Sequence, residues 1–217
     1  MSEYMLAALW TAFVDTLVMV SISSVIVWFA GIGLALILVT TTAGAIFQAL
    51  TLNRLLGGVI NAFRAVPFII LLVALIPLTR FLTGTTIGIW AAIVPITISA
   101  TPFFARVAEV SLREVSSGVI EAAEALGCER KDVIFRVLLP EAMPGIIGGF
   151  TITVVAMIGA SAMAGAIGAG GLGDLAIRYG YQRYDTVVMF SVIAILIVLV
   201  GGIQLVGDRI VAYLRAR

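Results

Sequence analysis

The sequence contains no histidine, one cysteine (Cys128) and one lysine (Lys131), and only 12% of its 217 residues are charged. A single cysteine cannot form an internal disulfide framework, and metal sites built on clusters of His and Cys are excluded. The phosphate-binding pattern G-x-x-x-x-G-K-[ST] is missing because Lys131 follows Arg130. No basic run interleaved with aromatics points to nucleic acid. We therefore expect no cofactor, no metal and no catalytic activity on this chain.

Apolar residues are what the sequence has in excess. They make up 62% of the chain, and the mean hydropathy of +1.19 is well above that of an ordinary soluble domain. A helix needs about 20 apolar residues to cross the hydrocarbon core of a bilayer. We predict an all-α polytopic membrane protein with one domain, residues 1–217. Its five predicted spans cover residues 17–40, 65–82, 86–104, 145–167 and 186–206.

The placement of arginine predicts the orientation of these spans. Most arginines lie between the first two spans, around a central loop at about 107–143, or after the last span, whereas Arg80, Arg178 and Arg183 fall on the other side. By the positive-inside rule the central loop and the C-terminus are cytoplasmic, and five spans then put the N-terminus outside. The start of the chain has no basic region or cleavage site of a signal peptide, so the first span is expected to be retained.

The central loop contains a segment that is typical of a helical hairpin. Ser117 can cap a first helix, and Gly127 suits the left-handed turn that ends it. A second helix over 129–138 is expected to stop at Pro140. The first helix places its glutamates, Glu121 and Glu124, away from a narrow apolar face. That face consists of Val119, Ala122, Ala123 and Leu126.

The same segment resembles the EAA loop in the membrane subunits of ATP-binding-cassette importers. Glu121-Ala122-Ala123 is followed by three residues and Gly127, and then by nine residues, Val137, one residue and Leu139-Pro140. Val137 stands where Ile is usual. The resemblance implies a type I importer permease fold and a coupling loop that docks on a separate ATPase. The docking residues expected on this basis are Glu121, Ala122, Ala123, Leu126, Gly127, Leu139 and Pro140. The alternative is an ordinary amphipathic hairpin on a membrane surface.

The predicted span 145–167 is rich in small residues, which let helices pack closely. Ser161 has no His or Lys companion that would make it a nucleophile, so helix packing is its expected role. Met163 is bulky among small neighbours and either fills a gap or lines a pathway at a two-fold axis. The candidates for the dimer axis or the pathway are Ala156, Ala160, Ser161, Met163 and Ala164.

The run Gly168-Ala169-Gly170-Gly171-Leu172-Gly173 fits the dinucleotide pattern G-x-G-x-x-G. It follows a predicted membrane helix rather than a strand, so the context for binding a pyrophosphate is missing. We expect a tight extracytoplasmic turn instead, where the fourth span packs closely on its neighbours. A similar run occurs in permeases for amino acids and osmoprotectants.

Along nearly its whole length the chain resembles the permease subunits of methionine importers. The segments that carry this resemblance are 61–72, 76–77, 91–95, the EAA-like loop, 139–142, the glycine run and 207–211. The resemblance implies a homodimer in the bacterial cytoplasmic (inner) membrane that imports methionine, including D-methionine and related amino acids. It also implies two cytoplasmic ATPase subunits that carry Mg-ATP, and an extracytoplasmic substrate-binding protein. A permease for another amino acid, an osmoprotectant or a phosphonate is the alternative within the class.

A stand-alone channel or secondary carrier is the alternative from another class. A proton-coupled carrier needs an ionisable group at membrane depth. The ionisable residues here, Glu109 among them, are expected at the ends of spans. A carrier would also leave the EAA-like loop without a role.

Overall fold

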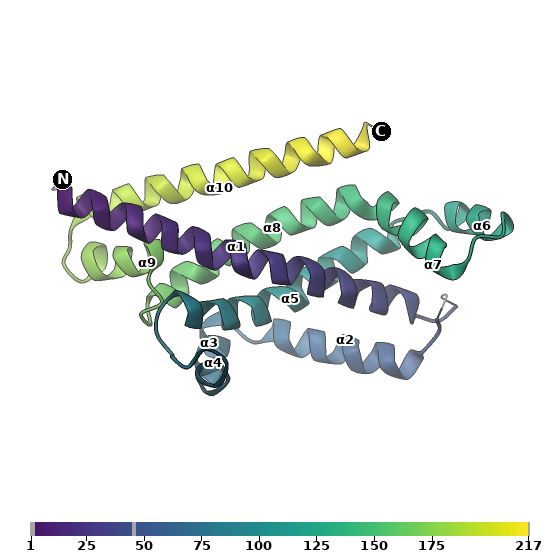
Figure 1. The fold of residues 1–217 in the computed structure, drawn as a ribbon, viewed down its shortest axis with the longest axis horizontal. Coiled ribbons are helices and arrows are strands. Elements are labelled where there is room, and N and C mark those ends of the chain that lie inside the picture. Colours follow the sequence, from purple (N-terminus) through teal and green to yellow (C-terminus); the bar gives the residue numbers. More distant parts are fainter. Residues whose placement is uncertain (1–2, 45–46, 217) are drawn as a thin grey trace. The chain divides into compact units, whose positions relative to one another are not determined.

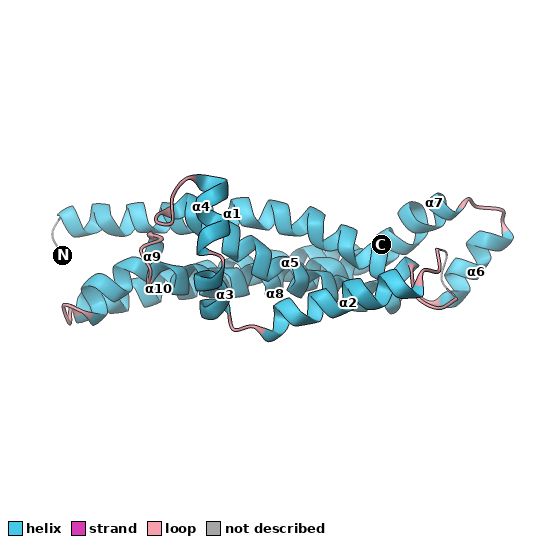
Figure 2. Ribbon diagram, turned by 90° about the horizontal axis from the view of Figure 1, so that it is seen from below, coloured by secondary structure: helices cyan, strands magenta, loops and turns pink. Residues whose placement is uncertain are grey.

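The computed structural model describes residues 3–44 and 47–216, and every regular element in these residues is helical (Figure 2). The expected all-α class is therefore confirmed. In chain order the elements are α1 (Glu3–Thr40), α2 (Leu50–Ala65), α3 (Phe68–Ala74), α4 (Ile76–Thr83), α5 (Ile89–Arg113), α6 (Ser117–Ala125), α7 (Arg130–Asp132), the π-helical η1 (Val133–Leu138), α8 (Leu139–Gly165), α9 (Gly171–Leu175), the π-helical η2 (Ala176–Tyr181) and α10 (Thr186–Arg215) (Figure 1).

Among the described residues, four helical runs are long and apolar enough to cross a membrane: α1, α5, Arg130–Gly165 and α10. α2 and α3 pass the same test as a pair, although they meet at an angle of 104°. The bend lies at Pro67, which has an extended backbone (φ −55°, ψ 137°) and keeps the preceding residue out of the helical region. The predicted span 65–82 thus contains the end of α2, all of α3 and most of α4. The number of crossings stays a prediction.

The chain divides into two compact units, each assembled from distant segments. One comprises the described residues up to Val27 together with Val66–Ala100 and Thr153–Gln204. The other comprises Trp28–Ala65, Thr101–Ile152 and the described residues from Leu205 onward. The long helices α1, α5, α8 and α10 contribute residues to both units.

The first unit contains the glycine run, which forms the predicted tight turn between α8 and α9. Gly168, Gly170 and Gly171 have φ angles of +86°, +84° and +78°, a region that favours glycine. A Cβ on Gly173 would lie 2.3 Å from the carbonyl oxygen of Ala162, so the backbones of α9 and α8 meet only because this residue is glycine. The turn delivers α9 into an apolar core. Its buried residues are Leu9, Ala12, Leu172, Leu175, Val188 and Val192.

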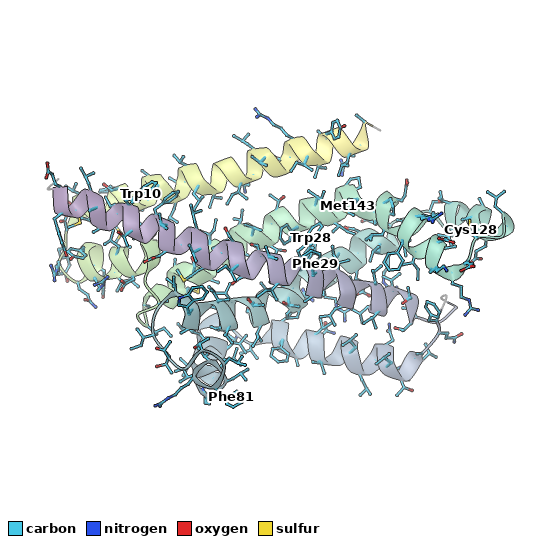
Figure 3. All side chains as sticks on the ribbon, viewed as in Figure 1. Trp10, Trp28, Phe29, Phe81, Cys128 and Met143 are labelled. Atoms are coloured by element: carbon cyan, nitrogen blue, oxygen red, sulfur yellow. The ribbon has the colours of Figure 1, made fainter. Side chains whose placement is uncertain are left out.

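The second unit packs three aromatic rings between α1, α5 and α8. Trp28 (Figure 3) lies 5.8 Å from Phe104 and 4.8 Å from Phe150, measured between ring centroids, and the two phenylalanines are 5.0 Å apart. A Cβ on Gly31 would come within 2.5 Å of Phe104 Cδ1, and one on Gly149 within 2.3 Å of Val107 Cγ1. Glycines therefore set the spacing of the helices that carry the hairpin described next.

Candidate functional site

The segment between α5 and α8 forms the helical hairpin that the sequence predicts (Figure 1). α6 ends before Gly127, whose φ is +80°. The amide of Gly127 donates to the Glu124 carbonyl at 2.9 Å, and the amide of Cys128 donates to the Ala123 carbonyl at 3.2 Å. These two bonds make a Schellman motif, in which a left-handed residue lets two amides satisfy the last carbonyls of a helix. The predicted role of Gly127 is confirmed.

Two details of the predicted hairpin are wrong. Ser117 is not the cap: Ser116 holds that position with an extended backbone (φ −59°, ψ 130°) and no capping side-chain bond, and Ser117 is the first helical residue. Pro140 does not stop the second helix, because α7, η1 and α8 form one continuous helical run to Gly165. The π-helical η1 ends just before Leu139. Its wider turn makes room for a proline that cannot donate a hydrogen bond.

The apolar face predicted for α6 is divided between two sides of the hairpin. Ala123 is buried, and the side of η1 that is turned inward consists of Val133, Ile134 and Leu138. Val119 and Leu126 lie on the outside, and Leu126 is 85% exposed. Ala122, Glu121 and Glu124 are also exposed. The hairpin therefore has its own small apolar seam and still presents a leucine at its tip.

Leu139 and Pro140 lie in the first turn of α8, where Leu139 is half-buried and Pro140 is exposed. They are therefore separated from the α6 residues by α7 and η1. Cys128, labelled in Figure 3, is a free, exposed thiol between α6 and α7.

A cavity of about 570 Å³ lies under α6, between the end of α1, the end of α5 and the hairpin. It has mixed charges in its wall: Arg113 from α5, Glu121 and Glu124 from α6, and Arg130 from α7. The guanidinium of Arg130 also lies over the ring of Phe47, 5.7 Å from its centroid. The docking segment is thus underlain by a polar space.

The sequence reasoning missed a buried charge next to this cavity. Glu109 in α5 is 4% exposed and accepts hydrogen bonds from Arg106 and Arg113. We expected it at a wet span end. The signal was present, because arginines three residues before and four residues after a glutamate share its face of a helix.

The candidate residues in α8 do not share one environment. Ser161 and Ala164 are buried, and the Ser161 hydroxyl donates to the carbonyl of Ile158 at 2.7 Å, as expected of a packing residue. Ala156 is exposed, Ala160 is partly buried, and Met163 is 52% exposed. Only the last three are therefore available to a partner or a pathway outside this chain.

The described residues show no arrangement for catalysis or metal binding. Across residues 3–44 and 47–216, no group of three or more His, Cys, Asp or Glu side chains is placed to hold a metal ion. Helices of membrane-crossing length, joined to a rigid polar hairpin, are the features of a multi-pass membrane protein with a docking element. The chain belongs to the family of binding-protein-dependent transport system inner membrane components, which matches residues 31–217.

Individual relatives are similar over nearly the whole chain. A probable D-methionine transport system permease protein, MetI, of Vibrio cholerae is 49% identical over 210 residues, which cover 97% of this chain and 92% of the relative. The methionine import system permease protein MetP of Bacillus subtilis is 42% identical, covering 94% and 92%.

Solved structures extend the similarity to the fold. A chain of the MetNI methionine ABC transporter in an inward-facing conformation is 44% identical, with a TM-score of 0.96 and 99% of each chain covered. A chain of an amino acid ABC transporter with histidines has a TM-score of 0.73 over 97% and 94% of the two chains, and at 19% identity it supports the fold alone.

We predict that Gly127→Val weakens the hairpin turn. A non-glycine residue in the left-handed region costs about 1–2 kcal/mol, so the two Schellman amides should exchange with deuterium about tenfold faster. The measurement is hydrogen–deuterium exchange of the peptide that spans Ala123 to Cys128. Gly118→Ala is the matched control, since Gly118 lies within α6 and a Cβ there would meet only Ser116 Oγ, at 3.6 Å. Equal exchange in all three proteins would contradict the assigned role of Gly127.

Proposed function

We propose that this chain is the permease subunit of an ATP-driven importer of methionine, including D-methionine and related amino acids. The observation that carries the proposal is the near-complete agreement with the permease chain of a methionine transporter, at 44% identity and a TM-score of 0.96. The relatives from Vibrio cholerae and Bacillus subtilis, both described as methionine permeases, support the same substrate. The closed hairpin supports the same class on physical grounds, because it offers a rigid docking element.

The proposal assigns ATP hydrolysis to a separate polypeptide. The sequence lacks a phosphate-binding loop with its lysine, so Mg-ATP belongs on a partner ATPase. Two such ATPases, a second copy of this chain and an extracytoplasmic substrate-binding protein complete the assembly. The family description, which specifies dependence on a binding protein, supports the last partner.

Orientation follows from where the nucleotide is. An ATPase that docks on the hairpin must be in the cytoplasm, so the hairpin and the central loop belong on that side of the bacterial inner membrane. The arginine distribution supports the same orientation, with the C-terminus cytoplasmic and the N-terminus outside.

The docking surface consists of the exposed part of the predicted set. Leu126 supplies an apolar anchor at the tip of α6, and Glu121 and Ala122 lie on the exposed flank of the same helix. Ala123 and Gly127 act by shaping the turn, since Ala123 is buried and Gly127 sets the backbone. Leu139 and Pro140 position the hairpin at the start of α8.

For the pathway, we propose Met163, Ala160 and Ala156 as the residues that face a second copy of the chain or the substrate. Their exposure supports this assignment. Ser161 and Ala164 are buried within the subunit and act as packing residues beneath them.

Transport by the purified complex tests the proposed function. The chain, reconstituted in liposomes with its native ATPase and binding protein, is expected to take up radiolabelled methionine only when ATP is inside the compartment that contains the ATPase. Omission of the ATPase or of the binding protein should abolish uptake. Methionine flux through this chain alone would favour a channel or carrier, and uptake of a different substrate class would correct the substrate only.

Docking predicts protection of Cys128. The thiol is exposed and lies directly after the turn, so a maleimide should react with it readily in the isolated permease. If the hairpin tip enters a cleft of the ATPase, labelling should slow by about tenfold or more on assembly because the thiol loses contact with water. Mass spectrometry of the intact chain gives the labelling rate. Equal rates before and after assembly would remove the hairpin from the interface.

The pathway assignment predicts that Ala160→Leu lowers methionine uptake by about tenfold or more, because a large side chain separates closely packed helices or fills the route between them. The ATPase should still assemble, with Cys128 protected as in the wild type. Val198→Leu, at an exposed position of α10, is the control for added bulk. Wild-type uptake by the Ala160 variant would show that this side of α8 faces lipid.

A further inference from the structure

Glu109 is a buried carboxylate that holds two arginines of its own helix. Its Oε2 accepts a hydrogen bond from Arg106 Nη1 at 2.6 Å, and its Oε1 accepts two from Arg113, from Nη2 at 2.8 Å and from Nε at 3.0 Å. A buried ion pair contributes little net stability after the cost of desolvation, whereas removal of one partner is costly. The network therefore favours one arrangement of its members more than it stabilises the fold.

Arg106 carries this network to a second helix. Its Nη2 donates to the Gly57 carbonyl at 3.3 Å and to Asn61 Oδ1 at 3.2 Å, both in α2. A Cβ on Gly57 would lie 3.2 Å from the same nitrogen, so the contact favours glycine. Beside it, Leu38, Ile60 and Ala105 form an apolar cluster between α1, α2 and α5. Arg106 is thus fixed by three acceptors on two helices.

Arg113 is held differently. Its bonds converge on one oxygen of Glu109, and half of its side chain is exposed (50%). It is the last residue of α5 and lines the 570 Å³ cavity under α6. Glu121 and Glu124 line the same cavity. Arg113 therefore has a second pair of carboxylates within the space that it faces, and it can leave Glu109 without opening the core.

We propose that Glu109 is a positioning residue that converts movement of the docking hairpin into movement of α5 and α2. When the ATPase loads α6, Arg113 exchanges Glu109 for Glu121 or Glu124 across the cavity. Arg106 stays on Glu109 and holds α5 to α2 as a pair. The inference rests on the proposed importer function, since it needs an ATPase that loads the hairpin. No published family description cited above assigns a role to Glu109 or Arg113.

The test is the amount of methionine transported per ATP hydrolysed by the reconstituted complex. Arg113→Gln removes the exchanging charge, and loss of a charge-assisted hydrogen bond should lower this ratio by about tenfold or more. Assembly and ATP hydrolysis should stay within about twofold of the wild type, because the hairpin turn is untouched. Glu109→Gln should act in the same way, and Glu109→Asp, which keeps the charge, should restore part of the ratio.

The exchange itself is tested by combining variants. If Arg113 acts through the carboxylates of α6, the substitutions Glu121→Gln and Glu124→Gln should add nothing to the loss already caused by Arg113→Gln. Arg178→Gln is the matched control. Arg178 is also a half-exposed arginine bonded to a buried carboxylate four residues earlier, that of Asp174, and it should leave the ratio unchanged.

Each outcome decides the inference. A wild-type ratio in Arg113→Gln would overturn it, as would fully additive losses in the combined variant. A parallel loss of assembly, hydrolysis and transport in Arg113→Gln would show a purely structural role and would also overturn it. If Glu109→Gln fails to insert into the membrane, the half-exposed Arg113 decides alone. Failure of the wild-type complex to transport methionine would instead count against the proposed function.

Discussion

The rest of the structure depends on one requirement, that backbone amides and carbonyls in an apolar surrounding be bonded within the chain. Long helices meet it, so the described residues form helices wherever the sequence allows them. Breaks are then confined to residues that change the backbone without leaving a polar group unpaired. Pro67 bends the chain between α2 and α3, and Gly127 closes α6 with two backbone bonds. The hairpin is therefore a product of the same requirement that makes the spans.

Close approach of helices follows from the same economy of side chains. At Gly173, Gly149 and Gly207 an added Cβ would lie 2.2–2.4 Å from an atom of a neighbouring helix. Between such contacts the chain tolerates few charges. Where it keeps one buried, at Glu109, the carboxylate is bonded to two guanidiniums. Charge is thus confined to a network with defined partners, and the movable member of that network, Arg113, lies at the rim.

Much of this architecture could be predicted from the sequence, because hydropathy and glycine act locally. The helical class, the turn after α8 and the positive φ of Gly127 all follow from residue type and spacing. Other features depend on three-dimensional context. A π-helical turn absorbs Pro140, and α2 forms a helix where a loop was expected. Which face of α8 is inside could not be read from small residues alone, since Ala156 and Ala164 share a stripe yet only Ala164 is buried.

The continuity of α7, η1 and α8 gives the sequence spacing a physical meaning. Nine residues, 128–136, separate Gly127 from Val137, and most of them belong to a helical run without a loop. One residue more or less would turn every later side chain by about 100° around the helix axis, given 3.6 residues per turn. A loop would absorb such a change, but a rod cannot. The distance from the glycine to Leu139-Pro140 therefore works as a ruler, and the length of this segment is under the same constraint as its composition.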